Sequence, residues 1–491
     1  MPSNYLCEMS SPASYSIARS TLWSAIDRFG IVLLQFVINL VLARLLTPHD
    51  FGVVGMILIF VAVSQTLVDG GFASALIQRI NPSPTDYATI FYWNILFSMV
   101  LYGVIYLVAP FVEQFFDIEN LATLLRVLGI VVVINALTFV QRVTLRKKID
   151  FKTIAIVDLV AYSASAVVAI FMAFRGFGAW SLVSMQLSIA LLSTILFWAL
   201  SSWRPIMAFS MESFRSLFSY GGYLLIASIM QDVCTHIQGV VIGRNFSAAQ
   251  TGLYSQAKKM DEVASMTLPA VMCQVLFPVY SKLQDDSVAL KNMLSANIRM
   301  VSFVIFPLMM LLIVVAAPLF VLLYGSQWVD AVPYFQLLCV GGFFSALYNF
   351  SYYAVAAVGR SKELFFWGCY KWGVLLLFLL VGASISMKGV LIAMVASNIN
   401  IWLTNSLLAQ RYVGYSLMQQ LRDVASAFCV TVLCGGVSYL LYQHVGAHWL
   451  LCSVVFVVLY VCVAKVCGMA AMGDVWQFIV KYLKRRGDDR C

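Results

Sequence analysis

Long apolar runs separated by short polar breaks dominate the chain. Each run has about 20 residues, the length that crosses the hydrocarbon core of a bilayer as a helix. Lipid offers no partners to free backbone N–H and C=O groups, so each run is expected to be helical. The pattern predicts about fourteen transmembrane helices. They are expected at 21–43, 52–77, 88–109, 121–141, 153–174, 178–200, 217–242, 252–280, 298–323, 331–357, 363–383, 389–410, 424–442 and 449–468.

Composition supports a membrane protein. Hydrophobic residues make up 62% of the 491 residues and charged residues only 11%, against roughly 25% charged in soluble proteins. No connection is long enough for a catalytic domain, which argues against an enzyme such as a polysaccharide polymerase. There is no phosphate-binding glycine loop with a following Lys, no HExxH and no Cys/His cluster. The sequence therefore predicts no catalytic residue and no metal site.

The basic residues predict the orientation. Assigning the N-terminus and every second connection to one side places most Lys and Arg there, including a cluster in 142–152 and a basic tail. By the positive-inside rule, both termini are expected in the cytoplasm of a bacterium, with the chain in its inner membrane. The net charge of +9 then reflects topology and anionic lipid headgroups rather than nucleic-acid binding. Residues 1–18 are polar and lack Lys and Arg, so the first run is expected to remain as an uncleaved span.

An internal duplication is expected. Several positions recur 200 residues later, and the repeat unit contains six helices, so both copies would insert in the same orientation. The sequence thus predicts two six-helix lobes related by a pseudo-twofold axis along the membrane normal, plus two C-terminal helices. The matched positions are Leu42, Arg44, Thr47, Asp50 and Gly52 with Ile242, Arg244, Ser247, Gln250 and Gly252. The expected divisions are an N-terminal lobe at 1–201, a cytoplasmic linker at 202–216, a C-terminal lobe at 217–411, and helices 13–14 with a basic tail at 412–491.

Polar residues inside the spans are the candidate site residues. A charge at the centre of a span costs about 2.5–3.5 kcal/mol on insertion scales, so such residues usually face protein or water. Arg28, Gln35 and Asn39 form one narrow stripe on the first span. The candidates for lining a substrate cavity are Arg28, Gln35, Asn39, Lys258, Lys259 and Lys371. Candidates for ion coupling are Asp69, Asp232 and His236, for which a structural helix–helix hydrogen bond is at least an equal interpretation.

Two segments resemble a known family. The stretch ARSTLWSAIDRFGIVLLQFVINLVLARLLTPHDFGVVGM at 18–56, followed by DGGF at 69–72, resembles the N-terminal signature of bacterial polysaccharide exporters. The stretch from GLYSQA at 252–257 to FPVYSKLQDD at 277–286 resembles a second signature. These exporters are the Wzx-type flippases of the multidrug/oligosaccharidyl-lipid/polysaccharide superfamily, in the colanic-acid exporter-like branch.

The resemblance implies a MATE-like fold and a substrate. Such proteins move an undecaprenyl-diphosphate-linked oligosaccharide from the cytoplasmic to the periplasmic leaflet, by alternating access through a central cationic cavity. It also implies membrane lipid, glycosyltransferases and a polysaccharide polymerase of the same pathway as partners. No cofactor is expected, and coupling to an H⁺ or Na⁺ gradient is left open. An ion-coupled multidrug antiporter of the same superfamily is the alternative, and a membrane polymerase a weaker one.

Overall fold

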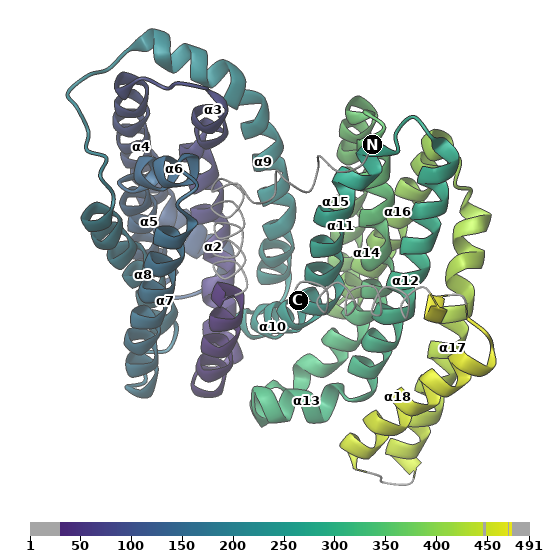
Figure 1. Cartoon of the computed structure of the whole chain (residues 1–491). Coiled ribbons are helices and arrows are strands. Elements are labelled where there is room, and N and C mark those ends of the chain that lie inside the picture. The colour runs from purple at the N-terminus through teal and green to yellow at the C-terminus, as the bar shows by residue number, and fades with distance from the viewer. Residues whose placement is uncertain (1–29, 445–447, 470, 474–491) are drawn as a thin grey trace, which may run out of the picture. The chain divides into compact units, whose positions relative to one another are not determined.

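The computed structural model describes residues 30–444, 448–469 and 471–473. Every regular element in that part is a helix, which confirms the all-α class (Figure 1). The chain divides into two compact units, unit 1 at 1–252 and unit 2 at 253–491. The expected lobe boundaries at 201 and 217 follow the sequence repeat and stay a prediction. Most of the basic C-terminal tail lies outside the described residues.

Unit 1 is a bundle in which α4 packs on α5, α7 on α8, and α2 on α9 (Figure 1). Its main core lies between α2 and α5, around Ile57, Leu125 and Leu128. Its helices are Gly30–Leu45, α2 (Pro48–Asp69), α3 (Phe72–Gln78), α4 (Pro84–Phe116), α5 (Leu121–Ala136), α6 (Phe139–Lys147), α7 (Phe151–Phe174), α8 (Ala179–Leu200), α9 (Met211–Asn245) and the start of α10 (Ala248–Glu262).

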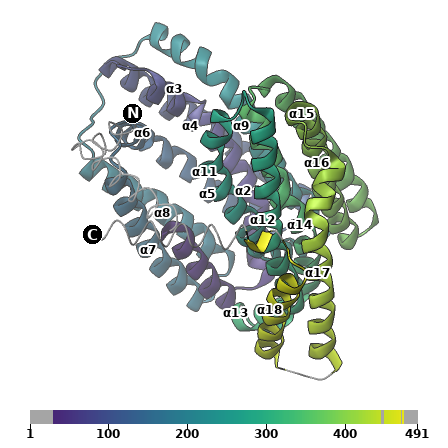
Figure 2. The same ribbon diagram turned by 45° about the vertical axis from the view of Figure 1, so that its right-hand side comes forward.

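Unit 2 is built around α14, which packs against α11, α12 and α16. Figure 2 shows α15 lying alongside α16, and α17 alongside α18. After α10, its elements are the π-helix η2 (Val263–Thr267), α11 (Leu268–Lys282), α12 (Ser287–Val314), α13 (Ala316–Leu323), the 3-10 helix η3 (Ser326–Ala331), α14 (Val332–Ala357), α15 (Ser361–Ile385), α16 (Met387–Val413), α17 (Leu417–His444) and α18 (Trp449–Val466).

Ten helices among the described residues are long and apolar enough to cross a membrane, or eleven if the bent pair α5–α6 is one span. The chain is therefore a multi-pass membrane protein. Three predicted spans are not among these helices. They correspond to the helix Gly30–Leu45, to α9, and to α10 with η2 and α11. The count of fourteen stays a prediction.

Matching positions of the two repeats meet in unit 1. A Cβ added to Gly52 would lie 1.7 Å from the carbonyl oxygen of Ala248, and a Cβ added to Gly252 would lie 1.8 Å from that of Pro48. Pro48 and Ala248 are 200 residues apart, as are Gly52 and Gly252. The N-termini of α2 and α10 thus cross in a reciprocal backbone contact that only glycine allows.

Helix capping explains two other repeated positions. The Thr47 hydroxyl accepts from the Asp50 N–H, and the Thr47 N–H donates to the Asp50 carboxylate at 2.9 Å, which forms a capping box at α2. Ser247 accepts from the Gln250 N–H at 3.2 Å at the start of α10. Each side chain satisfies an N–H of the first turn that has no partner within its helix.

Proline and a π-helical turn interrupt the predicted span at 252–280. The π-helix η2 ends at Thr267, and Pro269 lies in the first turn of α11. Proline has no N–H and cannot continue the regular ladder, so an irregular turn is expected beside it.

Candidate functional site

Unit 1 contains a cavity of about 610 Å³, and half of the residues that line it are polar. Its walls come from α2, α5, α6, α7 and α8, with His236 added by α9. Hydrogen-bonding groups from six helices therefore face one space. The polar lining residues are Gln65, Asn135, Thr138, Arg142, Asp158, Tyr162, Gln186, Ser193 and His236.

A second cavity of about 410 Å³ adjoins the first. The two share five lining residues, and we call the joined space the unit 1 cavity. The second part adds charge, because Asp69, Arg146 and Asp232 line it. The shared residues are Ala62, Gln65, Asn135, Phe139 and Arg142.

Arg142 lies where the two parts join. Its guanidinium donates to both carboxylate oxygens of Asp158, at 3.1 and 2.7 Å, and lies 4.9 Å from the centre of the Phe197 ring. The Asp158 side chain is 8% exposed and that of Arg142 33% exposed. This fork-to-fork geometry is the one in which arginine binds planar oxyanions most strongly.

A bend brings Arg142 into the cavity. The axes of α5 and α6 meet at 43°, across Leu137 and Thr138. Arg142 and Arg146 are four residues apart, so they lie on one face of α6. Both line the smaller part of the cavity, and the charge of Arg146 acts on the Asp69 carboxylate. The cavity therefore holds two guanidinium groups one helical turn apart.

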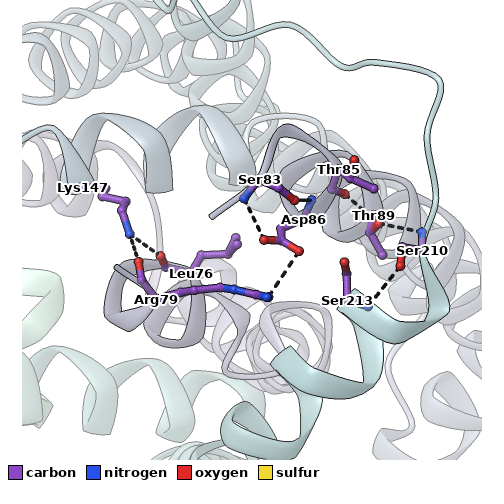
Figure 3. A network of polar contacts seen from close by, with 9 residues as sticks. All are labelled: Leu76, Arg79, Ser83, Thr85, Asp86, Thr89, Lys147, Ser210 and Ser213. Carbon is purple, nitrogen blue, oxygen red and sulfur yellow. Dashed lines mark hydrogen bonds and ion pairs between the residues drawn. The ribbon is translucent and has the colours of Figure 1, made fainter. Parts of the chain in front are cut away.

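Lys147 fixes the end of α6 on α3 (Figure 3). Its ammonium donates to the carbonyl oxygens of Leu76 at 2.9 Å and Ile77 at 3.2 Å, and also to that of Arg79. These carbonyls belong to the last turn of α3 and have no partner within the helix. A lysine next to Arg146 thus holds the arginine face of α6 in place.

Neighbouring contacts hold α3 to α4. Arg79 pairs with Asp86 at 3.2 Å, and Asp86 caps α4 by accepting from the Ser83 N–H at 2.8 Å (Figure 3). The Thr89 hydroxyl accepts from the Ser210 N–H at 3.0 Å, which ties the segment before α9 to α4. The frame that positions the arginines therefore includes four helices of unit 1.

All three predicted ion-coupling residues line the unit 1 cavity. Asp69 ends α2 and accepts from the Ala73 N–H at 3.2 Å across the Gly70–Gly71 break. Asp232 accepts from the Thr66 hydroxyl, which joins α9 to α2. His236 faces the larger part of the cavity. The hydrogen-bond role and the coupling role remain compatible with these positions.

The predicted stripe on the first span is only partly described. Arg28 lies outside the described residues. Gln35 is exposed and interacts with the hydroxyl of Tyr162, a cavity residue of α7. Asn39 is half-buried. Gln35 thus contacts a residue that lines the cavity.

The predicted lysines belong to unit 2. Lys258 pairs with Glu262 at 3.7 Å and lies 6.0 Å from the centre of the Tyr254 ring, whereas Lys259 is exposed. Lys371 is buried, at 8% exposure. It donates to the Asn405 side-chain oxygen at 3.0 Å, and its ammonium lies 5.5 Å from the centre of the Tyr352 ring.

Arg142 and Arg146 are the cavity residues that sequence reasoning missed. They fall in the basic cluster that was assigned to a cytoplasmic connection. A signal was present, because their i, i+4 spacing follows an apolar run and Asp158 occupies the next span. Among the described residues, no group of three or more His, Cys, Asp or Glu side chains could hold a metal ion.

These features define a class, a polytopic helical membrane protein with a charged cavity inside one lobe. Residues 41–333 match the family of polysaccharide biosynthesis proteins, and the chain belongs to that family. It is similar to the teichuronic acid biosynthesis protein TuaB of Bacillus subtilis, with 25% identity over 85% of this chain and 87% of the relative. It is also similar to the lipopolysaccharide biosynthesis protein WzxC of Escherichia coli, with 28% identity over 67% of each chain.

Solved structures show the same fold. The lipid II flippase MurJ in an inward closed conformation matches with a TM-score of 0.73 and 14% identity, over 91% of this chain and 98% of that one. A multidrug resistance MATE family transporter of the MOP superfamily, in an inward-facing conformation, matches with a TM-score of 0.58 and 16% identity, over 82% and 98%. The MATE-like fold and the family resemblance are confirmed. The family and these neighbours are transporters rather than enzymes.

Proposed function

We propose that the protein is a flippase that moves an undecaprenyl-diphosphate-linked oligosaccharide from the cytoplasmic to the periplasmic leaflet, for surface polysaccharide synthesis. The observation that carries the proposal is the unit 1 cavity with Arg142 and Arg146 on one face of α6. Family membership and the likeness to a lipid II flippase support the same substrate class.

The cavity chemistry suits such a headgroup. A diphosphate needs cationic partners in a membrane, and guanidinium groups bind its oxygens in pairs. Sugar hydroxyls need both donors and acceptors, which the amides of Gln65, Asn135 and Gln186 offer from three helices. Tyr162 adds an aromatic surface with a hydroxyl. The lipid tail would remain in the bilayer.

The cellular setting is part of the proposal. The positive-inside bias supports an inner-membrane location with both termini in the cytoplasm. Glycosyltransferases that build the lipid-linked sugar and a polymerase that extends it are the proposed partners in the pathway. Alternating access, with Arg28 and Lys371 as further cationic contacts, is the proposed mechanism. A proton or sodium gradient would act through Asp69, Asp232 or His236.

An ion-coupled multidrug antiporter is the second candidate. The specific observation in its favour is three carboxylates in the unit 1 cavity, those of Asp69, Asp158 and Asp232. Carboxylates suit a cationic drug. The two arginines in the same cavity oppose a cationic drug, because they repel a cation at close range. Three carboxylates against two guanidiniums do not decide between the two substrates, and family membership favours the oligosaccharide flippase.

The test is translocation in liposomes. Purified protein would be reconstituted with an undecaprenyl-diphosphate oligosaccharide, and the fraction inaccessible to an external sugar-modifying enzyme followed over time. We expect protein-dependent transfer that is lost in Arg28→Ala and Arg142→Ala. Arg175→Ala, at an exposed arginine outside the cavity, is the matched control and should transfer normally. No transfer by the wild type, with or without an ion gradient, together with efflux of a cationic dye, would favour the antiporter.

A further inference from the structure

In the Arg142–Asp158 pair, the guanidinium binds a carboxylate of the protein in the geometry that it would use for a ligand oxyanion. Both carboxylate oxygens of Asp158 are bound by the guanidinium, at 3.1 and 2.7 Å. Both residues of the pair line the larger cavity, and Arg142 also lines the smaller part. An oxyanion entering the cavity would meet the same guanidinium edge that Asp158 now occupies.

Asp158 would lose the partner of its charge once Arg142 turned to another anion. Its side chain is 8% exposed, and α7, which carries it, packs on α8 and contacts α6. Breaking a buried ion pair leaves an uncompensated charge, which is strongly unfavourable in a medium of low polarity. A buried group in that situation is neutralised by a change of protonation. Exchange of Asp158 for a ligand oxyanion therefore requires one proton from water.

Other ionisable groups face this pair. Tyr162 lies one turn along α7 and His236 faces the same cavity from α9. Asp69, Arg146 and Asp232 line the adjoining part. Within the part of the chain that the structure describes, Asp158 is the carboxylate whose two oxygens both accept from Arg142. Asp158 is thus distinct from the three coupling residues that the sequence suggested.

We propose that Asp158 occupies the oxyanion site of Arg142 in the empty protein, and that a substrate oxyanion displaces it with uptake of one proton. The inference rests on the proposed function and specifies how its binding step is coupled to protons. The oxyanion is either the lipid diphosphate or a sugar carboxylate, because both match the guanidinium fork. Binding of substrate and of a proton would then occur together.

The test counts protons on binding. Purified protein in detergent would be titrated by calorimetry in two buffers with different ionisation enthalpies. One arm uses undecaprenyl diphosphate without sugar and the other a hexuronate oligosaccharide without lipid. We expect uptake of about one proton per bound ligand in at least one arm, and that arm identifies the oxyanion. Binding without proton uptake, or no binding of either probe, would overturn the proposal.

Two variants test the role of each residue of the Arg142–Asp158 pair. Asp158→Asn should bind the same probe without proton uptake and about tenfold more tightly, the factor that one charge-assisted hydrogen bond is worth. Arg142→Lys keeps the charge but loses the fork, so it should bind more weakly. Asp423→Asn, in the Arg299–Asp423 pair of unit 2 at 3.4 Å, is the matched control and should keep the proton uptake.

The outcomes distinguish this proposal from the proposed function. Proton uptake that persists in Asp158→Asn would contradict the displacement, while transfer in liposomes would leave the flippase function standing. A wild-type protein that transfers no lipid-linked oligosaccharide would remove the function, and this inference with it.

Discussion

The reciprocal glycine contact between α2 and α10 gives the sharpest prediction of stability. Gly52→Ala would place a Cβ 1.7 Å from the Ala248 carbonyl oxygen, 2.5 Å from its carbon and 3.0 Å from the Gly252 nitrogen. Real Cβ atoms essentially never come within 3.0 Å of a heavy atom, so the helices must separate by about 1.3 Å or more. No rotamer change can relieve a clash between this Cβ and the backbone atoms of another helix.

The expected cost follows from overpacking. Inserting one methyl group into a packed contact costs about 1–3 kcal/mol, and occasionally more. We expect Gly52→Ala to lower the free energy of unfolding by about 3 kcal/mol, because the added Cβ meets the backbone of a second helix. Gly252→Ala, whose Cβ meets the Pro48 oxygen at 1.8 Å, should cost the same. The double variant should cost less than the sum, since one separation relieves both clashes.

Equilibrium unfolding in mixed detergent micelles would measure these free energies. Gly103→Ala is the control, because nothing lies within 4 Å of its added Cβ on α4. It should be neutral or stabilising by about 0.5 kcal/mol, as alanine restricts the unfolded chain and favours helix. If Gly52→Ala and Gly103→Ala unfold at the same denaturant concentration, the contact does not exist as described and the reasoning fails.

Three further variants test the frame of unit 1 by the same unfolding measurement. Arg142→Ala should lower the free energy of unfolding by about 3 kcal/mol, because it leaves Asp158 unpaired. Arg142→Met combined with Asp158→Leu should recover most of that loss. Single and double variants of equal stability would refute this. Thr47→Ala and Ser247→Ala should each cost about 1 kcal/mol as lost caps, whereas Ser384→Ala, an exposed hydroxyl, should not. Lys147→Met should cost about 1–2 kcal/mol because the last carbonyls of α3 lose their donor. Lys148→Met, whose ammonium lies 3.4 Å from the Ser202 hydroxyl, serves as its control and should change little.

The sequence predicted those parts of the structure that depend on lipid as solvent and on local chemistry. Apolar runs of sufficient length become helices because backbone polar groups have no alternative partner. The repeated Thr47 and Ser247 became helix caps because a hydroxyl three residues before an N–H satisfies it. Both signals operate within a few residues, so a single sequence carries them.

The arginine cavity depends on information that hydropathy does not contain. A basic residue at the end of an apolar run is normally assigned to water, and Arg142 follows the predicted span at 121–141 directly. The structure keeps it inside because α6 turns by 43° from α5, and because Asp158 on α7 neutralises it. The bend and the pairing are tertiary features, so neither can be obtained from the run alone. Lys147, which fixes that bend on α3, was likewise assigned to orientation.

Stability does not explain why Arg142 and Asp158 lie together at the cavity. Replacing a buried ion pair by apolar side chains of similar size is often neutral or stabilising, so the pair is a poor device for holding helices together. The helices around the cavity of about 610 Å³ also lack packing contacts there, and such contacts are the main attraction between helices in lipid. The close contact at Gly52 shows that unit 1 can pack helices tightly where nothing must pass. A charged pair beside empty space is therefore best understood as a site that exchanges its own carboxylate for a ligand.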